Sequence, residues 1–117
     1  MIDMINLQNI DPNMIANNIT PSVLTHPGEV LREELEERGI TQTDLAKQIG
    51  IKVSQLNEII NCKRSISATV ALLLEAALGV DADLWLNMQK SYDKGIVKQD
   101  KSFLERLAKI RNIAAAL

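Results

Sequence analysis

The chain has 117 residues and a formal net charge of −2, with 46% hydrophobic and 24% charged residues. These values are ordinary for a globular protein, and the length predicts one small domain with a tail. Aromatic residues make up only 3% of the chain, so the core must consist of Leu, Ile, Val and Ala, which suits packed helices. The mildly acidic charge argues against a protein that coats nucleic acid without sequence preference.

Several classes of site are disfavoured by what the sequence lacks. Its single cysteine, Cys62, can form neither an internal disulfide nor a cysteine-based zinc cluster, and we expect no metal and no cofactor. No apolar run approaches the roughly 18 residues of a membrane span. The first 24 residues also lack the basic start and apolar block of a signal peptide. We therefore expect a cytoplasmic protein that does not bind membranes.

Residues 1–24 predict a flexible N-terminal tail, partly disordered or docked, because neither a helical nor a strand period persists in them. The tail nevertheless carries many isolated apolar side chains: Met1, Ile2, Met4, Ile5, Leu7, Ile10, Met14, Ile15 and Ile19. Such a segment is too apolar for a purely solvated linker. We expect it to dock on this domain, on a sister subunit or on a partner.

Clear start and stop signals predict helices along the rest of the chain. They run from Pro27 to Gly39, from Thr41 to Gly50, from about 52 to 60, from Ser67 to Gly79, from Asp81 to Gly95, and from about 101 onward. No segment reads as a strand. The pattern predicts an all-α bundle of five or six helices, with a tail at 1–24, a helical domain at 25–95 and a helical extension at 96–117.

The segment TQTDLAKQIGIKVSQLNEIIN, residues 41–61, has the form of a helix-turn-helix. Two helices of about eight residues are joined by a short turn at Gly50, for which we expect a positive φ. Ala46 is small enough to let the helices cross closely. The apolar residues Leu45, Ile49, Ile51, Leu56 and Ile59 then form a small core.

This arrangement leaves one side of the second helix free to enter the major groove of DNA. The candidates for reading bases are Lys52, Val53, Ser54, Asn57 and Glu58. Asn can bind adenine through two hydrogen bonds, Val can contact a thymine methyl, and Glu can accept from a cytosine amine. The candidates for phosphate contacts are Gln42, Thr43, Lys63, Arg64 and Ser65. The alternative is a solvated helical hairpin with no ligand.

Four motifs give the chain a specific resemblance: HPGE.L.EEL...G, TQ.DLA..IG, LNEIIN.KR.IS and LG...D.WLN.Q..YD. Together they cover residues 26–93, and the pattern resembles the HigA antitoxin family, also called virulence-associated protein I. This family belongs to the phage-repressor-like (lambda-repressor-like) helix-turn-helix regulators. The chain departs from the family pattern at Lys52, where Ser is usual, and at Cys62, where Gly is usual and where we expect a slightly strained turn.

The resemblance implies a homodimeric repressor of its own toxin–antitoxin operon, which binds a palindromic operator in double-stranded DNA. It also implies that the protein neutralises a cognate mRNA-cleaving toxin. Two alternatives stay open: a stand-alone repressor of phage or plasmid type, and an interaction adaptor that no longer binds DNA.

An enzymatic function is disfavoured by the motifs. The only histidine, His26, precedes Pro27 at a helix start, which is typical of a structural role. HExxH, G-x-S-x-G and Walker patterns are absent from the sequence. We therefore expect no catalytic residues.

Two apolar stripes are candidates for the dimer interface. One contains Trp85 and Met88, and the other contains Phe103, Leu107 and Ile110, at heptad-like steps. Either stripe could instead pack on the core of its own chain. For the toxin, the acidic residues Glu29, Glu33, Glu34, Glu36 and Glu37 offer one site, although solvated acidic helices are common. The apolar tail is an equally good candidate.

Overall fold

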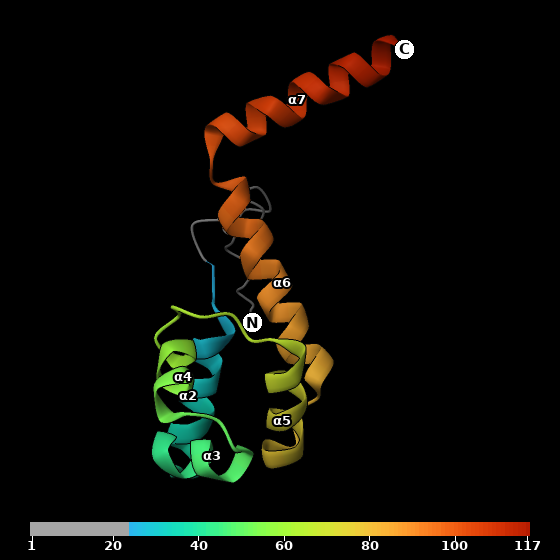
Figure 1. The fold of residues 1–117 in the computed structure, drawn as a ribbon. Helices are drawn as coiled ribbons and strands as arrows, with labels where there is room; N and C mark the ends of the chain where they lie inside the picture. The colour runs from blue at the N-terminus through green and yellow to red at the C-terminus, as the bar shows by residue number, and fades with distance from the viewer. Residues whose placement is uncertain (1–23) are drawn as a thin grey trace, which may run out of the picture. The chain divides into compact units, whose positions relative to one another are not determined.

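The computed structural model describes residues 24–117 (Figure 1). Within this range the chain forms helices and no strand, which confirms the all-α prediction. The helices are α2 (Pro27–Arg38), α3 (Gln42–Ile49), α4 (Val53–Ile60), α5 (Ala68–Leu78), α6 (Ala82–Lys98) and α7 (Lys101–Ala116). The tail predicted for residues 1–24 lies, except for Leu24, outside the described residues.

Except for α4, the helices begin where a side chain accepts a hydrogen bond from the free N–H groups of the first turn. The side chains that do so are those of His26, Thr41, Ser67, Asp81 and Asp100. Three helices end at a glycine in the left-handed conformation: Gly39 (φ 68°), Gly50 (φ 77°) and Gly79 (φ 75°). The positive φ expected for Gly50 is confirmed.

The contacts divide the chain into two compact units, of which Thr25–Lys94 is the first. In this unit α3 packs against α4 and α5, and α2 packs against α4 (Figure 1). Its core is aliphatic except for one tryptophan, and the largest fully buried side chains are Trp85, Leu31, Leu45, Leu56, Ile59, Ile60 and Leu74. This composition follows from the low aromatic content of the chain.

The second unit contains, among the described residues, Leu24 and residues 95–117. The prediction that Gly95 ends a helix is wrong, because α6 continues through it to Lys98. A helical glycine costs about 1 kcal/mol relative to alanine. At Gly95 the end of the Leu24 side chain occupies the space that a Cβ would need, so the glycine makes room for this packing and does not mark a helix end.

The α7 helix has no buried residue. Apolar side chains along it, such as those of Ile110 and Ile113, are more than half exposed. Among residues 24–117, no helix combines the length and the apolar character that crossing a bilayer requires.

The turn after α4 contains the strain that the sequence predicts. Cys62 has a φ of 64° and is the one non-glycine residue with a positive φ in the described range. This conformation costs a residue with a Cβ roughly 1–2 kcal/mol. Burial raises the pKa of the Cys62 thiol, with Glu29 adding to this effect, so the thiol stays protonated at neutral pH.

We expect Cys62→Gly to raise the free energy of unfolding by up to about 1 kcal/mol. The relieved strain exceeds the roughly 0.5–1 kcal/mol that glycine costs through the entropy of the unfolded chain. Urea unfolding at fixed protein concentration measures the change. Ser65→Gly is the matched control, since Ser65 lies in the same loop without a positive φ, and it should destabilise. A loss of stability in both variants would show that Cys62 is not strained.

Candidate nucleic-acid interface

The helix-turn-helix forms because α3 and α4 bury one side of each helix. Ala46 is fully buried at their packing, as are Leu45 and Leu56, while Ile49 is 8% exposed. Ile51, also expected in this core, is half-buried. The side of α4 that remains outward carries the residues predicted to read bases. Lys52, Val53, Ser54 and Asn57 are exposed there, and Glu58 is half-buried.

The start of α4 differs from the other helix starts. Lys52 occupies the N-cap position with an extended backbone, but its side chain makes no capping hydrogen bond. A lysine ammonium group only donates, so it cannot serve the free N–H groups of the first turn. These N–H groups, together with the exposed ammonium group of Lys52, give the amino end of α4 a positive character.

Asn57 takes part in a chain of polar side chains that the sequence did not predict. Its Nδ2 donates to Gln42 Oε1 at 3.1 Å, and its Oδ1 accepts from Asn61 Nδ2 at 3.1 Å. Asn61 Oδ1 in turn accepts from Arg32 Nη2 at 2.9 Å. A predicted base contact and a predicted phosphate contact are therefore joined directly, and two further residues, Asn61 and Arg32, support them.

Glu58 and Arg64 form an ion pair between α4 and the loop that follows it. Arg64 Nε and Nη2 each lie 2.7 Å from Glu58 Oε1. About half of each side chain is exposed, and such pairs contribute at most about 1 kcal/mol. A phosphate group could therefore replace Glu58 as the partner of Arg64 at small cost.

The loop after α4 is held in place by α6. Gln89, 5% exposed, accepts from the Ile66 N–H through Oε1 at 2.9 Å. Its Nε2 donates to Asp93 Oδ1 at 2.9 Å. These bonds fix the end of a loop in which Lys63, Arg64 and Ser65 are all exposed. Gln89 and Asp93 stand in the family motif quoted above, but only the structure gives them this role.

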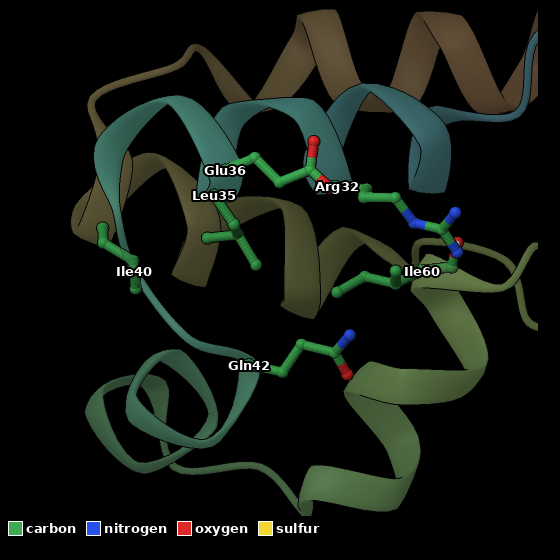
Figure 2. A pocket seen from close by; sticks show the side chains of 6 residues that line it. All are labelled: Arg32, Leu35, Glu36, Ile40, Gln42 and Ile60. Carbon is green, nitrogen blue, oxygen red and sulfur yellow. The ribbon is translucent and has the colours of Figure 1, made fainter.

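A shallow concavity of about 400 Å³ lies beside the chain of amides (Figure 2). It is lined by Arg32, Leu35, Glu36, Ile40, Gln42 and Ile60. Figure 2 shows the Arg32 guanidinium beside Ile60 and the Gln42 amide reaching toward α4. Among residues 24–117, no cluster of His, Cys, Asp and Glu could hold a metal ion.

His26 has a structural position at the start of α2. Its Nδ1 accepts from the Gly28 N–H at 2.8 Å, and its own N–H donates to Glu29 Oε2 at 3.3 Å. The ring makes an edge-to-face contact with Tyr92, with centroids 4.9 Å apart. Burial lowers the pKa of His26, against the smaller opposing effects of Asp93 and Glu29.

The lowered pKa of His26 predicts that acid destabilises the protein. The folded state favours the neutral ring, so this contribution to stability is fully present above the ordinary pKa of 6.5 and is lost as the pH falls through the folded value. The free energy of unfolding should therefore decline below pH 6.5. His26→Asn should flatten this decline below pH 6.5, because an amide oxygen caps the helix without titrating. His26 is the only histidine in the chain, so equal slopes for both proteins in urea unfolding would contradict the assignment.

One candidate for the dimer interface needs correction. Trp85 is fully buried in the core of its own unit, so it cannot present its side chain to a second copy. The alternative of core packing is the right one for this residue. Its place in an apolar stripe made it a candidate, but the sequence does not reveal which side of α6 faces the core of its own chain. Met88 is half-buried against the same core.

Comparisons with known proteins identify the class to which the chain belongs. A helix-turn-helix family model matches residues 31–85. Virulence-associated protein I of Dichelobacter nodosus is 47% identical over 87 residues, which is 74% of this chain and 79% of the relative. Both matches contain α3 and α4, so the class is that of helix-turn-helix regulators with a lambda-repressor-like fold.

Similar solved structures identify the family within this class of regulators. An addiction module antidote protein of the HigA family from Coxiella burnetii is 35% identical, with a TM-score of 0.64 over 71% of this chain and 92% of that one. Pseudomonas aeruginosa antitoxin HigA, solved with the higBA promoter, is 28% identical, with a TM-score of 0.64 over 77% of this chain and 94% of that one. The chain belongs to the HigA-type (virulence-associated protein I) antitoxin family, whose members are DNA-binding regulators and not a class of enzymes.

Proposed function

We propose that the protein represses its own operon by binding a palindromic operator as a homodimer, and that it neutralises a cognate mRNA-cleaving toxin. The observation that carries the DNA part is the outward side of α4, where Lys52, Val53, Ser54 and Asn57 are exposed. The basic loop with Lys63 and Arg64 follows directly. Pseudomonas aeruginosa antitoxin HigA, a relative of the same fold, was solved with the higBA promoter, which supports DNA binding by this protein.

The proposed division of roles follows the chemistry of the side chains. Ser54 and Asn57 are short and polar, so α4 can approach base edges closely. Lys63 and Arg64 carry charge on a loop that Gln89 holds in place, which suits contacts to phosphate groups. Gln42 and Thr43 stand at the amino end of α3, where N–H groups point outward and attract anions.

A single α4 reads only a few base pairs, so a second copy is needed for a specific site. In a two-fold dimer the two recognition helices meet half-sites about one helical turn, or ~34 Å, apart. The best candidate for the contact between copies is α7, where Phe103 and Leu107 are half-buried and Ile110 is 57% exposed. These residues recur along one stripe at heptad-like steps.

The variant Ile110→Glu should weaken dimerisation at least tenfold, because it places a charge in the apolar stripe of α7. Folding should be unaffected, since Ile110 is 57% exposed within its own chain. Sedimentation equilibrium measures the dissociation constant. Asn112→Glu is the control, because it adds the same charge at an exposed position outside the stripe. If both variants sediment like the wild type, α7 does not join the copies.

The toxin part rests on family membership and on charge. The α2 helix exposes Glu29, Glu33, Glu36 and Glu37, and such a surface would attract a basic ribonuclease. Co-expression with the product of the adjacent gene tests this part. Co-purification of a small basic protein, and relief of its toxicity, is the expected result. A stand-alone repressor would show neither.

A further inference from the structure

A continuous chain of hydrogen bonds joins α2, α3 and α4 on the proposed DNA-binding side. Arg32 Nη2 donates to Asn61 Oδ1 at 2.9 Å. Asn61 Nδ2 donates to Asn57 Oδ1 at 3.1 Å and to the Asn57 carbonyl at 3.0 Å. Asn57 Nδ2 donates to Gln42 Oε1 at 3.1 Å. The three amides therefore lie in series behind a single guanidinium group.

The direction of this chain is fixed by groups that cannot exchange roles. A guanidinium group only donates, and a backbone carbonyl only accepts. Arg32 therefore requires the oxygen of Asn61 on its side, and the Asn57 carbonyl requires the nitrogen of Asn61 on the other. Asn61 Nδ2 then requires Asn57 Oδ1 toward it, which turns Asn57 Nδ2 toward Gln42.

This orientation matters for base recognition, because an asparagine amide is nearly symmetric in shape but not in hydrogen bonding. To bind adenine, asparagine must accept from N6–H and donate to N7, each on a defined side. A reversed amide would present two mismatched groups to the same base. In this protein Asn57 keeps one N–H and one lone pair beyond those used in the chain, so it can make this pair of bonds in one orientation.

We infer that Arg32 and Asn61 are positioning residues for base reading: they hold the Asn57 amide in one orientation and so determine which base pair α4 prefers at that position. This inference rests on the proposed recognition of DNA by α4. Neither residue needs to touch DNA. Arg32 also donates to the Ile60 carbonyl at 3.5 Å, which anchors the guanidinium at the end of α4 (Figure 2).

Asn61→Asp tests the inference because it replaces a donor by an acceptor without changing the shape of the side chain. The carboxylate can still accept from Arg32, but it cannot donate to Asn57. The Asn57 amide should then turn its nitrogen toward residue 61. We expect discrimination at the base pair that Asn57 faces to fall about fivefold or more. The readout is the ratio of dissociation constants for the footprinted operator and for operators with single base-pair changes.

The ratio of dissociation constants distinguishes the loss of a positioning residue from the effect of an added negative charge. Ser65→Asp adds the same negative charge on the loop after α4, and it should weaken binding to all sequences alike while leaving the ratio unchanged. Arg32→Lys keeps a group that only donates and should retain discrimination, whereas Arg32→Met should lose part of it. In an Asn57→Ser background, Asn61→Asp should no longer change the ratio. Thermal unfolding of each variant checks that it remains folded.

Two results would overturn the inference. An unchanged ratio in folded Asn61→Asp would show that Asn61 does not orient Asn57. An equal loss in Ser65→Asp would assign the effect to charge alone. A wild-type chain with no sequence preference would instead remove the proposed function, and the inference with it.

Discussion

Gly28→Ala lowers the free energy of unfolding by about 3 kcal/mol or more, the largest stability effect that we expect from a single methyl group in this chain. Gly28 lies in the first turn of α2, where its Cα faces the backbone of α4. A Cβ at this position would overlap the carbonyl group of Ile59, which belongs to the backbone and cannot rotate away. The two helices would have to separate, and both carry residues of the amide chain: Arg32 on α2 and Asn57 on α4.

Whether Gly28→Ala raises or lowers the free energy of unfolding shows how closely α2 and α4 approach each other. Gly28 does not have a positive φ, and at an open helical site alanine would stabilise by up to about 1 kcal/mol. Gly39→Ala is the control, since nothing lies near its Cβ position and only its φ of 68° opposes alanine, at roughly 1–2 kcal/mol. Thermal and urea unfolding measure both. If Gly28→Ala is neutral or stabilising, α2 and α4 do not approach as closely as described.

Lys63→Ala combined with Arg64→Ala should lower affinity for every duplex by about a hundredfold at moderate salt. In a dimer the change removes about four phosphate contacts, each of which contributes about 0.9 to the slope of log affinity against log salt. The slope should become correspondingly shallower, while the preference for the operator over other sequences is retained. Titration of labelled duplexes at several salt concentrations measures both quantities.

Ser54→Ala and Asn57→Ala should show the opposite behaviour. Each removes a group proposed to read bases, so the preference for the operator should fall by about 1–3 kcal/mol with little change in the salt slope.

The ion pair between Glu58 and Arg64 offers a further test of this division. Glu58→Gln releases Arg64 and should strengthen binding to all sequences if the role of Glu58 is to hold Arg64. If Glu58 reads a cytosine, preference would be lost instead. Identical effects of all these changes would contradict the division between base and phosphate contacts.

The structure shows which contacts the residues of the family motifs make. In HPGE, His26 caps α2, Pro27 fills its first position, Gly28 admits the backbone of α4, and Glu29 bonds back to the His26 N–H. In the later motif, Gln89 holds the loop after α4 and Tyr92 packs against His26. The two motifs are distant in sequence, but both support the position of α4.

Local chemistry made most helix boundaries predictable from the sequence. Thr41 and Ser67 signal helix starts, and Gly39, Gly50 and Gly79 signal helix ends, because caps and left-handed glycines act within one turn. The same reasoning failed at Gly95. There the glycine makes room for the side chain of Leu24, a residue far away in sequence, and no local pattern distinguishes the two causes.

The sequence predicted which residues of α4 are exposed at the candidate site, but not the hydrogen bonds that join them to other helices. The pattern of α4 indicates which residues point outward, and Ser54 and Asn57 are exposed as expected. It does not indicate that Asn57 is bonded to Gln42, 15 positions earlier, or that Arg32 lies beside Asn61, 29 positions away. Trp85 shows the same limit, since the stripe predicts an apolar side of α6 but not whether its own chain covers it.

Footprinting on the duplex upstream of the protein's own gene, with the full chain, tests the central claim most directly. The claim predicts two protected half-sites of related sequence, about one helical turn apart, whose protection weakens steeply as salt rises. Protection should also be lost with Lys63→Ala and Arg64→Ala combined. Equal affinity for this duplex and for a scrambled one of the same length would contradict it.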